Sequence, residues 1–400
     1  MLNLGRLTTY NLLHMKLLSV VGARPNFMKI APLVAAIQKH NKARPDRHIE
    51  HLLLHTGQHY DIRLSENFFT ALGIPQPDIN LEIGSGTHAE QVGRTMMAFE
   101  KVLYHIKPNW VVVVGDVNAT LACSVTAKKE NVKCCHIEAG LRSGDMNMPE
   151  EVNRLVTDRL SDLLLTPDRI SSDNLRHEGV PEEKIRFVGN IMIDTLEANR
   201  DKAADLSIPA ILAANRIADT GKPPEIDLSG PYAVVTLHRH SNVDRKEVME
   251  PLLHFLINEV ASIMPVLWPV HPRTMKQLTL FGLWGKAETT PNMMLLHPLG
   301  YHDMLRLNMD ARIMLTDSGG LQEECCILGT PCLTLRWNTE RPVTLREHGG
   351  ASVLVGNDVE RIRTEFHTTL ANGIMPTRPE LWDGHTAERI VELFAGEFYE

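Results

Sequence analysis

Residues 110–122 read WVVVVGDVNATLA, and they indicate the fold class of the chain. Five apolar residues without alternation predict a β-strand that is covered on both faces, as the strands of a parallel sheet are. The strand ends at Gly115-Asp116, and the pattern of residues 119–130 predicts a helix directly after it. A parallel strand followed by a helix is the repeating unit of α/β proteins.

The same strand-then-helix unit returns along the chain. A strand at 16–21 is followed by a loop and a helix at 27–40, and a strand that ends at 136–138 is followed by a helix at 150–162. Further strands are predicted at 185–188, 232–237, 265–268, 313–315 and 332–335. These strands are too many for one sheet, so we predict two doubly wound, Rossmann-like domains that face a cleft.

The domain limits follow from a change in composition. Residues 207–231 are rich in Ala, Pro, Gly and Asp and place the boundary near residues 190–230. We predict an N-terminal domain over residues 1–190 and a C-terminal domain over residues 191–375. A C-terminal helix within residues 376–400 is expected to pack back on the first domain.

Composition excludes several classes of protein. The 400 residues carry 41 Lys and Arg against 49 Asp and Glu, a net charge of −8, which argues against a protein that coats nucleic acid or binds membranes through basic residues. No apolar run approaches the roughly 20 residues that span a bilayer. The first fourteen residues lack the features of a secretory signal, and Met15 is an alternative start. The six cysteines include adjacent pairs and form no C-x-x-C motif, so we predict reduced, mostly buried thiols and a cytoplasmic protein.

Polar residues at the predicted strand ends are the candidates for a functional site, because doubly wound proteins bind ligands beyond the carboxyl ends of their strands. The candidates are Arg24, Gln58, His59, Asp116, Glu138, His238, His271 and the segment 317–320.

The segment Asp317-Ser318-Gly319-Gly320 separates a predicted strand from a predicted helix. Two glycines at the amino end of a helix let a phosphate approach the free N–H groups, although an ordinary capped turn has the same spacing. Glu324 in this helix could accept the hydroxyls of a ribose, or it could belong to a solvated helix face. Arg24 could bind a diphosphate as a fork, or it could be an ordinary surface residue. The first loop lacks the G-x-G-x-x-G motif, which argues against an NAD enzyme.

Three carboxylates, Asp116, Glu138 and Glu150, would be able to remove and return protons if they met in the cleft. Asp116 could instead cap the following helix, and Glu150 stands at a first turn, where the helix dipole favours acidic residues. The chain has 19 histidines, so His238 and His240 are expected to lie close together by chance; we predict no metal site here and keep His238 as a phosphate contact or acid–base group.

Several segments occur in one order along residues 15–395. They are GARPNFMKIAPL (22–33), HTGQHYD (55–61), GDVNATLA (115–122), HIEAGLRSGDMNMPEEVNR (136–154), GNIMIDTL (189–196), TLHRHSNVD (236–244), HPRT (271–274), TDSGGLQEE (316–324) and TERP (339–342). Together they resemble the non-hydrolysing UDP-N-acetylglucosamine 2-epimerases. The resemblance implies a two-domain fold of the glycosyltransferase B type, a homodimer without a cofactor, and interconversion of UDP-N-acetylglucosamine with UDP-N-acetylmannosamine.

The resemblance also implies roles for individual residues. The positions that hold UDP are Arg24, His238, Ser318, Gly319, Gly320, Glu324 and Arg341. The positions implicated in catalysis are Asp116, Glu138, Glu150 and His238. Some bacterial members bind a second UDP-N-acetylglucosamine as an allosteric activator, at positions that match Gln58, His59, Arg239 and His271. HRHSNVD stands here where many bacterial members have HRREN.

Three other functions remain open from the sequence. The chain could epimerise a modified substrate such as a UDP-diacetamido-uronic acid, or it could hydrolyse its substrate and release N-acetylmannosamine. It could also be a nucleotide-sugar binding protein without catalytic activity.

Overall fold

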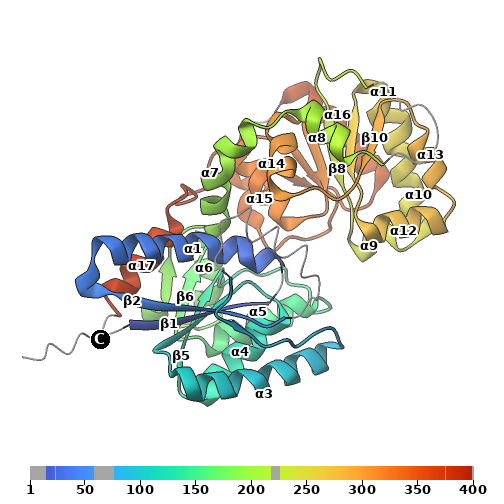
Figure 1. Ribbon diagram of the computed structural model, residues 1–400. Coiled ribbons are helices and arrows are strands. Elements are labelled where there is room, and N and C mark those ends of the chain that lie inside the picture. Colours follow the sequence, from blue (N-terminus) through green and yellow to red (C-terminus); the bar gives the residue numbers. More distant parts are fainter. Residues whose placement is uncertain (1–14, 23, 58–75, 218–225, 374, 399–400) are drawn as a thin grey trace, which may run out of the picture.

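The computed structural model describes residues 15–22, 24–57, 76–217, 226–373 and 375–398, with the backbone alone at residues 24 and 25. Two all-parallel sheets form the centres of two lobes (Figure 1). The first sheet has the order β3-β2-β1-β4-β5-β6-β7. Its strands are β1 (Met15–Val21), β2 (Ile49–His55), β3 (Ile79–Asn80), β4 (Trp110–Val114), β5 (Lys133–Ile137), β6 (Leu163–Thr166) and β7 (Ile185–Phe187).

The apolar run at 110–114 is covered on both faces, as predicted. Trp110, Val112 and Val114 belong to one core cluster with α1 (Arg24–Ala43), while Val111 and Val113 belong to another with α3 (His88–Ile106) and α4 (Asn118–Lys129). Successive residues of a strand point to opposite faces, so a strand between two helical layers needs apolar residues at every position. Helices α5 (Pro149–Leu160) and α6 (Arg169–His177) and the 3₁₀ turns η1 (Pro45–Arg47) and η2 (Glu182–Lys184) complete this lobe.

The second sheet has the order β10-β9-β8-β11-β12-β13. Its strands are β8 (Ala233–Thr236), β9 (Val266–Pro269), β10 (Met293–Leu296), β11 (Ile313–Thr316), β12 (Cys332–Thr334) and β13 (Ser352–Leu354). The helical segments of this part of the chain are α8 (Ile208–Asn215), α9 (His240–Val243), α10 (Lys246–Phe255), η3 (Leu256–Val260), α11 (Ala261–Ile263), α12 (Pro272–Leu280), α13 (Trp284–Glu288), α14 (Tyr301–Asp310), α15 (Gly319–Leu328), η4 (Pro342–Thr344), η5 (Arg346–His348) and α16 (Val359–Asn372).

Two helices connect the lobes. Helix α7 (Ile191–Ala204) follows the first sheet and contacts α1 on one side and α14 and α15 on the other. Helix α17 (Thr386–Ala395), near the end of the chain, packs against α1 and α7 (Figure 1). Its Phe394 ring lies 5.6 Å from the ring of Trp110. The domain limits drawn from composition stay a prediction.

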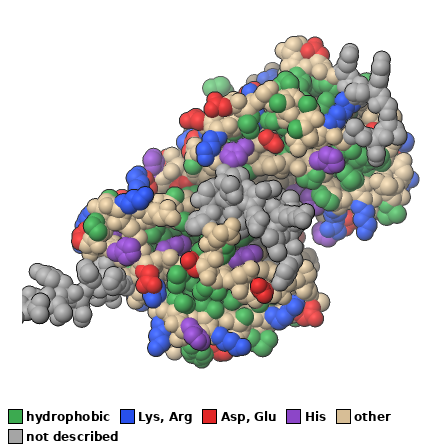
Figure 2. Space-filling model, viewed as in Figure 1, with side chains coloured by type: hydrophobic (Ala, Val, Ile, Leu, Met, Phe, Trp, Pro, Cys, Tyr) green, Lys and Arg blue, Asp and Glu red, His purple; other side chains and the backbone are tan. Residues whose placement is uncertain are grey.

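The prediction of a two-sheet α/β fold is confirmed, although five strands were not named from the sequence: β2, β3, β6, β10 and β13. They are short, or they contain polar residues that weaken the apolar signal. The six cysteines all lie in described segments, and they are buried and free of disulfides, as predicted. On the face drawn in Figure 2, basic and acidic side chains are interspersed. In the described segments, no helix combines the length and apolar character that crossing a bilayer requires.

Candidate functional site

Charged side chains meet at the carboxyl ends of β1, β4 and β5. Lys29 lies in the second turn of α1, and its Nζ forms an ion pair with Oε2 of Glu138, which directly follows β5. The two side chains are only 9% and 3% exposed. A Cβ atom at Gly115, the residue after β4, would lie 3.0 Å from the Nζ of Lys29, so the pair packs closely against a position without a side chain.

The backbone of Glu138 is unusual. Its φ of 71° lies in the left-handed region, which costs a non-glycine residue about 1–2 kcal/mol. Its Oε1 atom is buried and has no hydrogen-bond partner in the described part of the chain. A strained residue that presents an unsatisfied carboxylate oxygen is a strong candidate for a functional group.

Asp116, which follows β4, is held by an arginine. Its Oδ2 accepts hydrogen bonds from Nη2 and Nε of Arg154, at 2.6 and 3.0 Å. Burial opposes ionisation of Asp116, but the charges of Arg154, Lys29 and Arg341 outweigh it and keep the pKa below its usual value. With 26% of its side chain exposed, Asp116 is an ionised carboxylate at the edge of the buried cluster.

In the second lobe, the amino end of α15 is open to an anion. The side chain of Ser318, the residue before α15, makes no capping hydrogen bond. The guanidinium of Arg341 lies across this end of the helix, because a Cβ atom on Gly319 would be only 2.8 Å from its Nη1. Uncapped N–H groups beside a guanidinium form a site suited to phosphate.

Two buried carboxylates hold Arg341 in place. Its Nε lies 2.7 Å from Oε1 of Glu323, and its Nη1 forms an ion pair with Glu340. Glu340 also accepts a hydrogen bond of 2.6 Å from Arg336. Burial opposes ionisation of Glu340, but the two arginines outweigh it and hold its pKa well below the usual value. Burial dominates at Glu323 and raises its pKa.

His238, two residues after the end of β8, is oriented by Asp317. The Nδ1 of His238 lies 2.8 Å from Oδ1 of Asp317, which also accepts hydrogen bonds from the backbone N–H groups of His238 and Arg239. Burial opposes ionisation of Asp317, but the hydrogen bond and charge of His238 and the backbone donors lower its pKa. The His238 ring lies 5.5 Å from the ring of His271.

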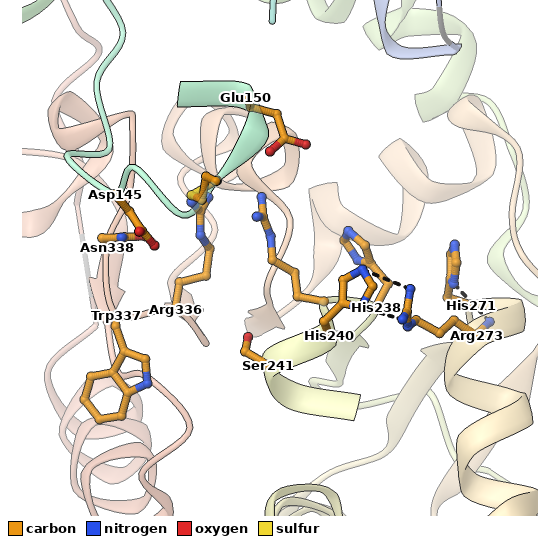
Figure 3. Close-up of a pocket in the computed structure, with 12 residues that line it drawn as sticks. Asp145, Glu150, His238, His240, Ser241, His271, Arg273, Arg336, Trp337 and Asn338 are labelled. Atoms are coloured by element: carbon orange, nitrogen blue, oxygen red, sulfur yellow. Dashed lines mark hydrogen bonds between the residues drawn. The ribbon is translucent and has the colours of Figure 1, made fainter. Parts of the chain in front are cut away.

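A cleft of about 580 Å³ is lined by residues of both lobes (Figure 3). The exposed side chain of Glu150, in the first turn of α5, faces the His238 side of the cleft. The cationic and imidazole side chains that line the cleft are His238, Arg239, His240, His271, Arg273 and Arg336. They are suited to an anionic ligand.

Glu324 is buried further along α15. Burial raises its pKa to about 8, against the effect of a hydrogen bond with Asn308. The buried hydroxyl of Tyr301, whose ionisation is influenced by Glu324, has no hydrogen-bond partner in the segments described. The pair could bind a neutral polar group such as a hydroxyl. In the described segments, no three His, Cys, Asp or Glu side chains are grouped so that they could hold a metal ion.

The model of the family described as UDP-N-acetylglucosamine 2-epimerase matches residues 41–395 of this sequence. The chain belongs to the UDP-N-acetylglucosamine 2-epimerase family. Members of this family are isomerases, and the chain is therefore an enzyme of that class.

Individual relatives match over nearly the whole chain. The UDP-N-acetylglucosamine 2-epimerase of Methanocaldococcus jannaschii is 39% identical over 387 residues, which are 95% of this chain and 98% of the relative. The UDP-2,3-diacetamido-2,3-dideoxy-D-glucuronate 2-epimerase of Pseudomonas aeruginosa is 37% identical over 385 residues, 95% of this chain and 99% of the relative. The crystal structure of the M. jannaschii enzyme in complex with UDP-GlcNAc and UDP has a TM-score of 0.82, and the match covers 95% of this chain and 99% of that one.

The fold of this epimerase family member gathers the selected residues into two neighbouring groups. Lys29 pairs with Glu138 and lowers the pKa of Asp116, so these carboxylates lie around one lysine. Glu150 instead lines the cleft. Ser318, Gly319 and Gly320 start α15, Arg341 crosses its amino end and Glu324 lies buried within it, while His238, Arg239 and His271 line the cleft. The roles assigned to all these residues stay predictions.

Some selected residues cannot be placed in the site. Gln58 and His59 lie outside the described residues. Arg24 is the first residue of α1, and its side chain is likewise outside the part that the structure describes.

Several charged and polar residues of the site were not among the candidates selected from the sequence. They are Lys29, Arg154, Asn190, Glu323 and Glu340. All five lie inside the segments that resemble the family, so the segments contained the signal. Each lies beyond a strand end or within a helix, whereas the candidates were selected from polar residues at strand ends.

Proposed function

We propose that this chain interconverts UDP-N-acetylglucosamine and UDP-N-acetylmannosamine by eliminating UDP and adding it back. The observation that carries the proposal is the cleft lined by both lobes, to which the first lobe contributes Glu150 and the second His238. Burial lowers the pKa of Arg341, but Glu323, Glu340 and, from the first lobe, Glu138 and Asp116 outweigh it and raise the pKa well above the usual value. A nucleotide sugar held at Arg341 would therefore have acidic side chains close to its hexose ring.

The chemistry requires such an arrangement. The hydrogen on carbon 2 of the sugar is not acidic, because no carbonyl group adjoins that carbon. Its removal becomes feasible when the bond between carbon 1 and the phosphate oxygen breaks at the same time. The electron pair of the C–H bond then forms the double bond between carbons 1 and 2 of a 2-acetamidoglucal. The electron pair of the bond between carbon 1 and the phosphate oxygen leaves with UDP.

The return step inverts carbon 2. The phosphate oxygen of UDP adds to carbon 1, and a proton is delivered to the face of carbon 2 opposite the one that lost it. Asp116, Glu138 and Glu150 supply the proton transfers, together with His238. Arg24, Arg341, Ser318, Gly319, Gly320 and Glu324 hold the UDP, whose developing charge the helix end and the arginines stabilise.

Deuterium exchange tests the proposal directly. Incubation with UDP-N-acetylglucosamine in heavy water is expected to place deuterium at carbon 2 of both epimers, as read by proton NMR. The Glu138→Gln variant, which retains the size of the side chain, serves as the matched control and is expected to lose most of the exchange. If the native enzyme leaves carbon 2 unlabelled, the proposed reaction is wrong.

A second substrate is tested in the same assay. The relative named as a UDP-diacetamido-glucuronate 2-epimerase is nearly as similar to this chain as the relative named as a UDP-N-acetylglucosamine 2-epimerase. A kcat/KM for the diacetamido sugar above that for UDP-N-acetylglucosamine would make it the preferred substrate. Accumulation of UDP with free N-acetylmannosamine would instead identify a hydrolysing enzyme.

The proposal also includes binding of a second substrate molecule as an activator and assembly of the chain into a homodimer. Arg239 and His271 line a cleft of cationic character, which supports binding of a second UDP-N-acetylglucosamine as an activator. The rate is then expected to depend sigmoidally on substrate concentration, and Arg239→Met to remove the sigmoidal part. A homodimer, which the family resemblance implies, would give twice the chain mass of 44.9 kDa in light scattering.

A further inference from the structure

Glu323 is buried at 2% exposure in the second turn of α15, and it contacts residues from two separate parts of the chain. Its Oε1 forms an ion pair of 2.7 Å with Nε of Arg341, without the geometry of a hydrogen bond, and accepts a hydrogen bond of 2.8 Å from Nδ2 of Asn190. Its Oε2 is buried and has no hydrogen-bond partner among the described residues. A buried carboxylate is costly unless it is paired, so these contacts bind the three side chains together.

Each side of Arg341 has a different neighbour. Glu323 lies at Nε, the inner edge of the guanidinium, while Nη1 lies over the amino end of α15, next to Glu340. The ion pair at Nε leaves Nη1 of Arg341 at the helix end. Glu323 therefore sets the direction of the arginine without occupying the edge that a phosphate would use.

Asn190 connects this pair to the segment between the lobes. Its Oδ1 accepts a hydrogen bond of 2.9 Å from the backbone N–H of Met192 and so caps α7. The preceding Gly189 has a φ of 95°, and a Cβ atom there would lie 2.2 Å from the carbonyl oxygen of Leu381. The turn that carries Asn190 thus packs closely against the backbone of Leu381, and the asparagine amide donates a hydrogen bond to Glu323 while its oxygen caps α7.

We propose that Glu323 is a positioning residue, which holds Arg341 over the amino end of α15 for a nucleoside diphosphate and, through Asn190, ties the arginine to the helix between the lobes. The inference deepens the proposed function, since it concerns the UDP side of the same site. It predicts that the geometry of the Glu323 carboxylate, and not only its charge, determines the affinity for UDP.

Two substitutions of Glu323 separate charge from geometry. Glu323→Gln keeps the length and an oxygen for Asn190 but loses the charge that faces Arg341, whereas Glu323→Asp keeps the charge but is one methylene shorter. Both are expected to raise the Kd for UDP by about 10-fold or more in calorimetry, because the buried ion pair with Arg341 is lost or misplaced. Both are expected to raise KM more than they lower kcat.

Asn190→Ser tests the tie to α7. Serine can still cap the helix but is too short to reach Glu323, so a smaller rise in the Kd for UDP, about threefold, is expected with little change in thermal stability. The matched control is Glu259→Gln, which removes the carboxylate 2.7 Å from Arg363 at a place remote from the site, and it is expected to leave the Kd unchanged.

The outcomes distinguish the inference from its alternatives. A Kd for UDP within about twofold of the native value in both Glu323 variants overturns it, whatever their melting temperatures. If these variants unfold, an unchanged Kd in Asn190→Ser overturns the tie to α7, and a raised Kd supports it. UDP binding is measured without turnover, so it is independent of the proposed reaction. If the native protein binds UDP but does not exchange deuterium, the proposed function is wrong. The role of Glu323 is then still tested by the Kd values of the variants.

Discussion

Replacing Glu138 by glutamine, alanine and glycine separates the chemical role of this residue from the backbone conformation that it adopts. All three variants leave Lys29 without its carboxylate, and removal of one partner of a buried ion pair costs about 3–5 kcal/mol of stability. Glutamine is expected at the low end, because its amide oxygen can still accept a hydrogen bond from the lysine. Turnover is expected to fall about 10²–10⁴-fold in each variant if Glu138 transfers a proton.

The relative stability of the alanine and glycine variants is the more specific part of this prediction. At a φ of 71°, a non-glycine residue pays about 1–2 kcal/mol, whereas glycine loses about 0.5–1 kcal/mol more backbone entropy than alanine on folding. The difference makes Glu138→Gly more stable than Glu138→Ala by about 0.5–1 kcal/mol, the reverse of their order inside a regular helix or strand.

Urea unfolding followed by circular dichroism measures the difference, with deuterium exchange at carbon 2 as the activity assay. If alanine is as stabilising as glycine at this position, the backbone strain assigned to Glu138 is wrong. If the glutamine variant keeps native exchange rates, Glu138 does not transfer the proton.

A methyl group at Gly319 would lie 2.8 Å from the arginine that crosses the amino end of α15, whereas one at Gly320 would meet no atom within 4 Å. Gly319→Ala is therefore expected to weaken UDP binding in calorimetry about 10-fold and Gly320→Ala much less, and equal effects would contradict the placement of the arginine. Arg154→Met removes a charge that lowers the pKa of Asp116, so the acidic limb of the pH profile of kcat is expected to move to higher pH; an unmoved limb would exclude Asp116 as the base. Burial raises the pKa of Glu324 to about 8, so its ionisation opposes folding, and stability should fall as the pH rises from the usual carboxyl range to about 8. Glu324→Gln is expected to flatten this decline in urea titrations at several pH values, and an unchanged slope would show that the carboxyl is not buried in solution.

The strand ends were informative because their chemistry is local. Glu138 directly follows a predicted strand, and Asp116 follows another after a single glycine, so both could be selected from the order of amino acids. The histidine after β8 and the two glycines at the start of α15 were selected for the same reason. Their grouping follows from the parallel sheet, in which all the carboxyl ends lie at one edge.

The partners of these residues could not be selected in this way. Lys29 is 109 residues from Glu138, and Asn190 is 133 residues from Glu323. Neither pair has a periodicity or a spacing that connects its members, because the contact depends on how one helix lies over a sheet or on how the two lobes meet.

The amino-acid order alone was sufficient for the class of fold, the sites at strand ends and the family resemblance, since each rests on residues that are close together in the chain. The assignment of Glu150 to the cleft, the strained backbone of Glu138 and the holding of Arg341 between two carboxylates required the packed molecule. A buried ion pair forms where tertiary packing brings two charged side chains within a few ångströms of each other and excludes water. The two side chains can come from any positions in the sequence, so their separation along the chain does not predict the pair.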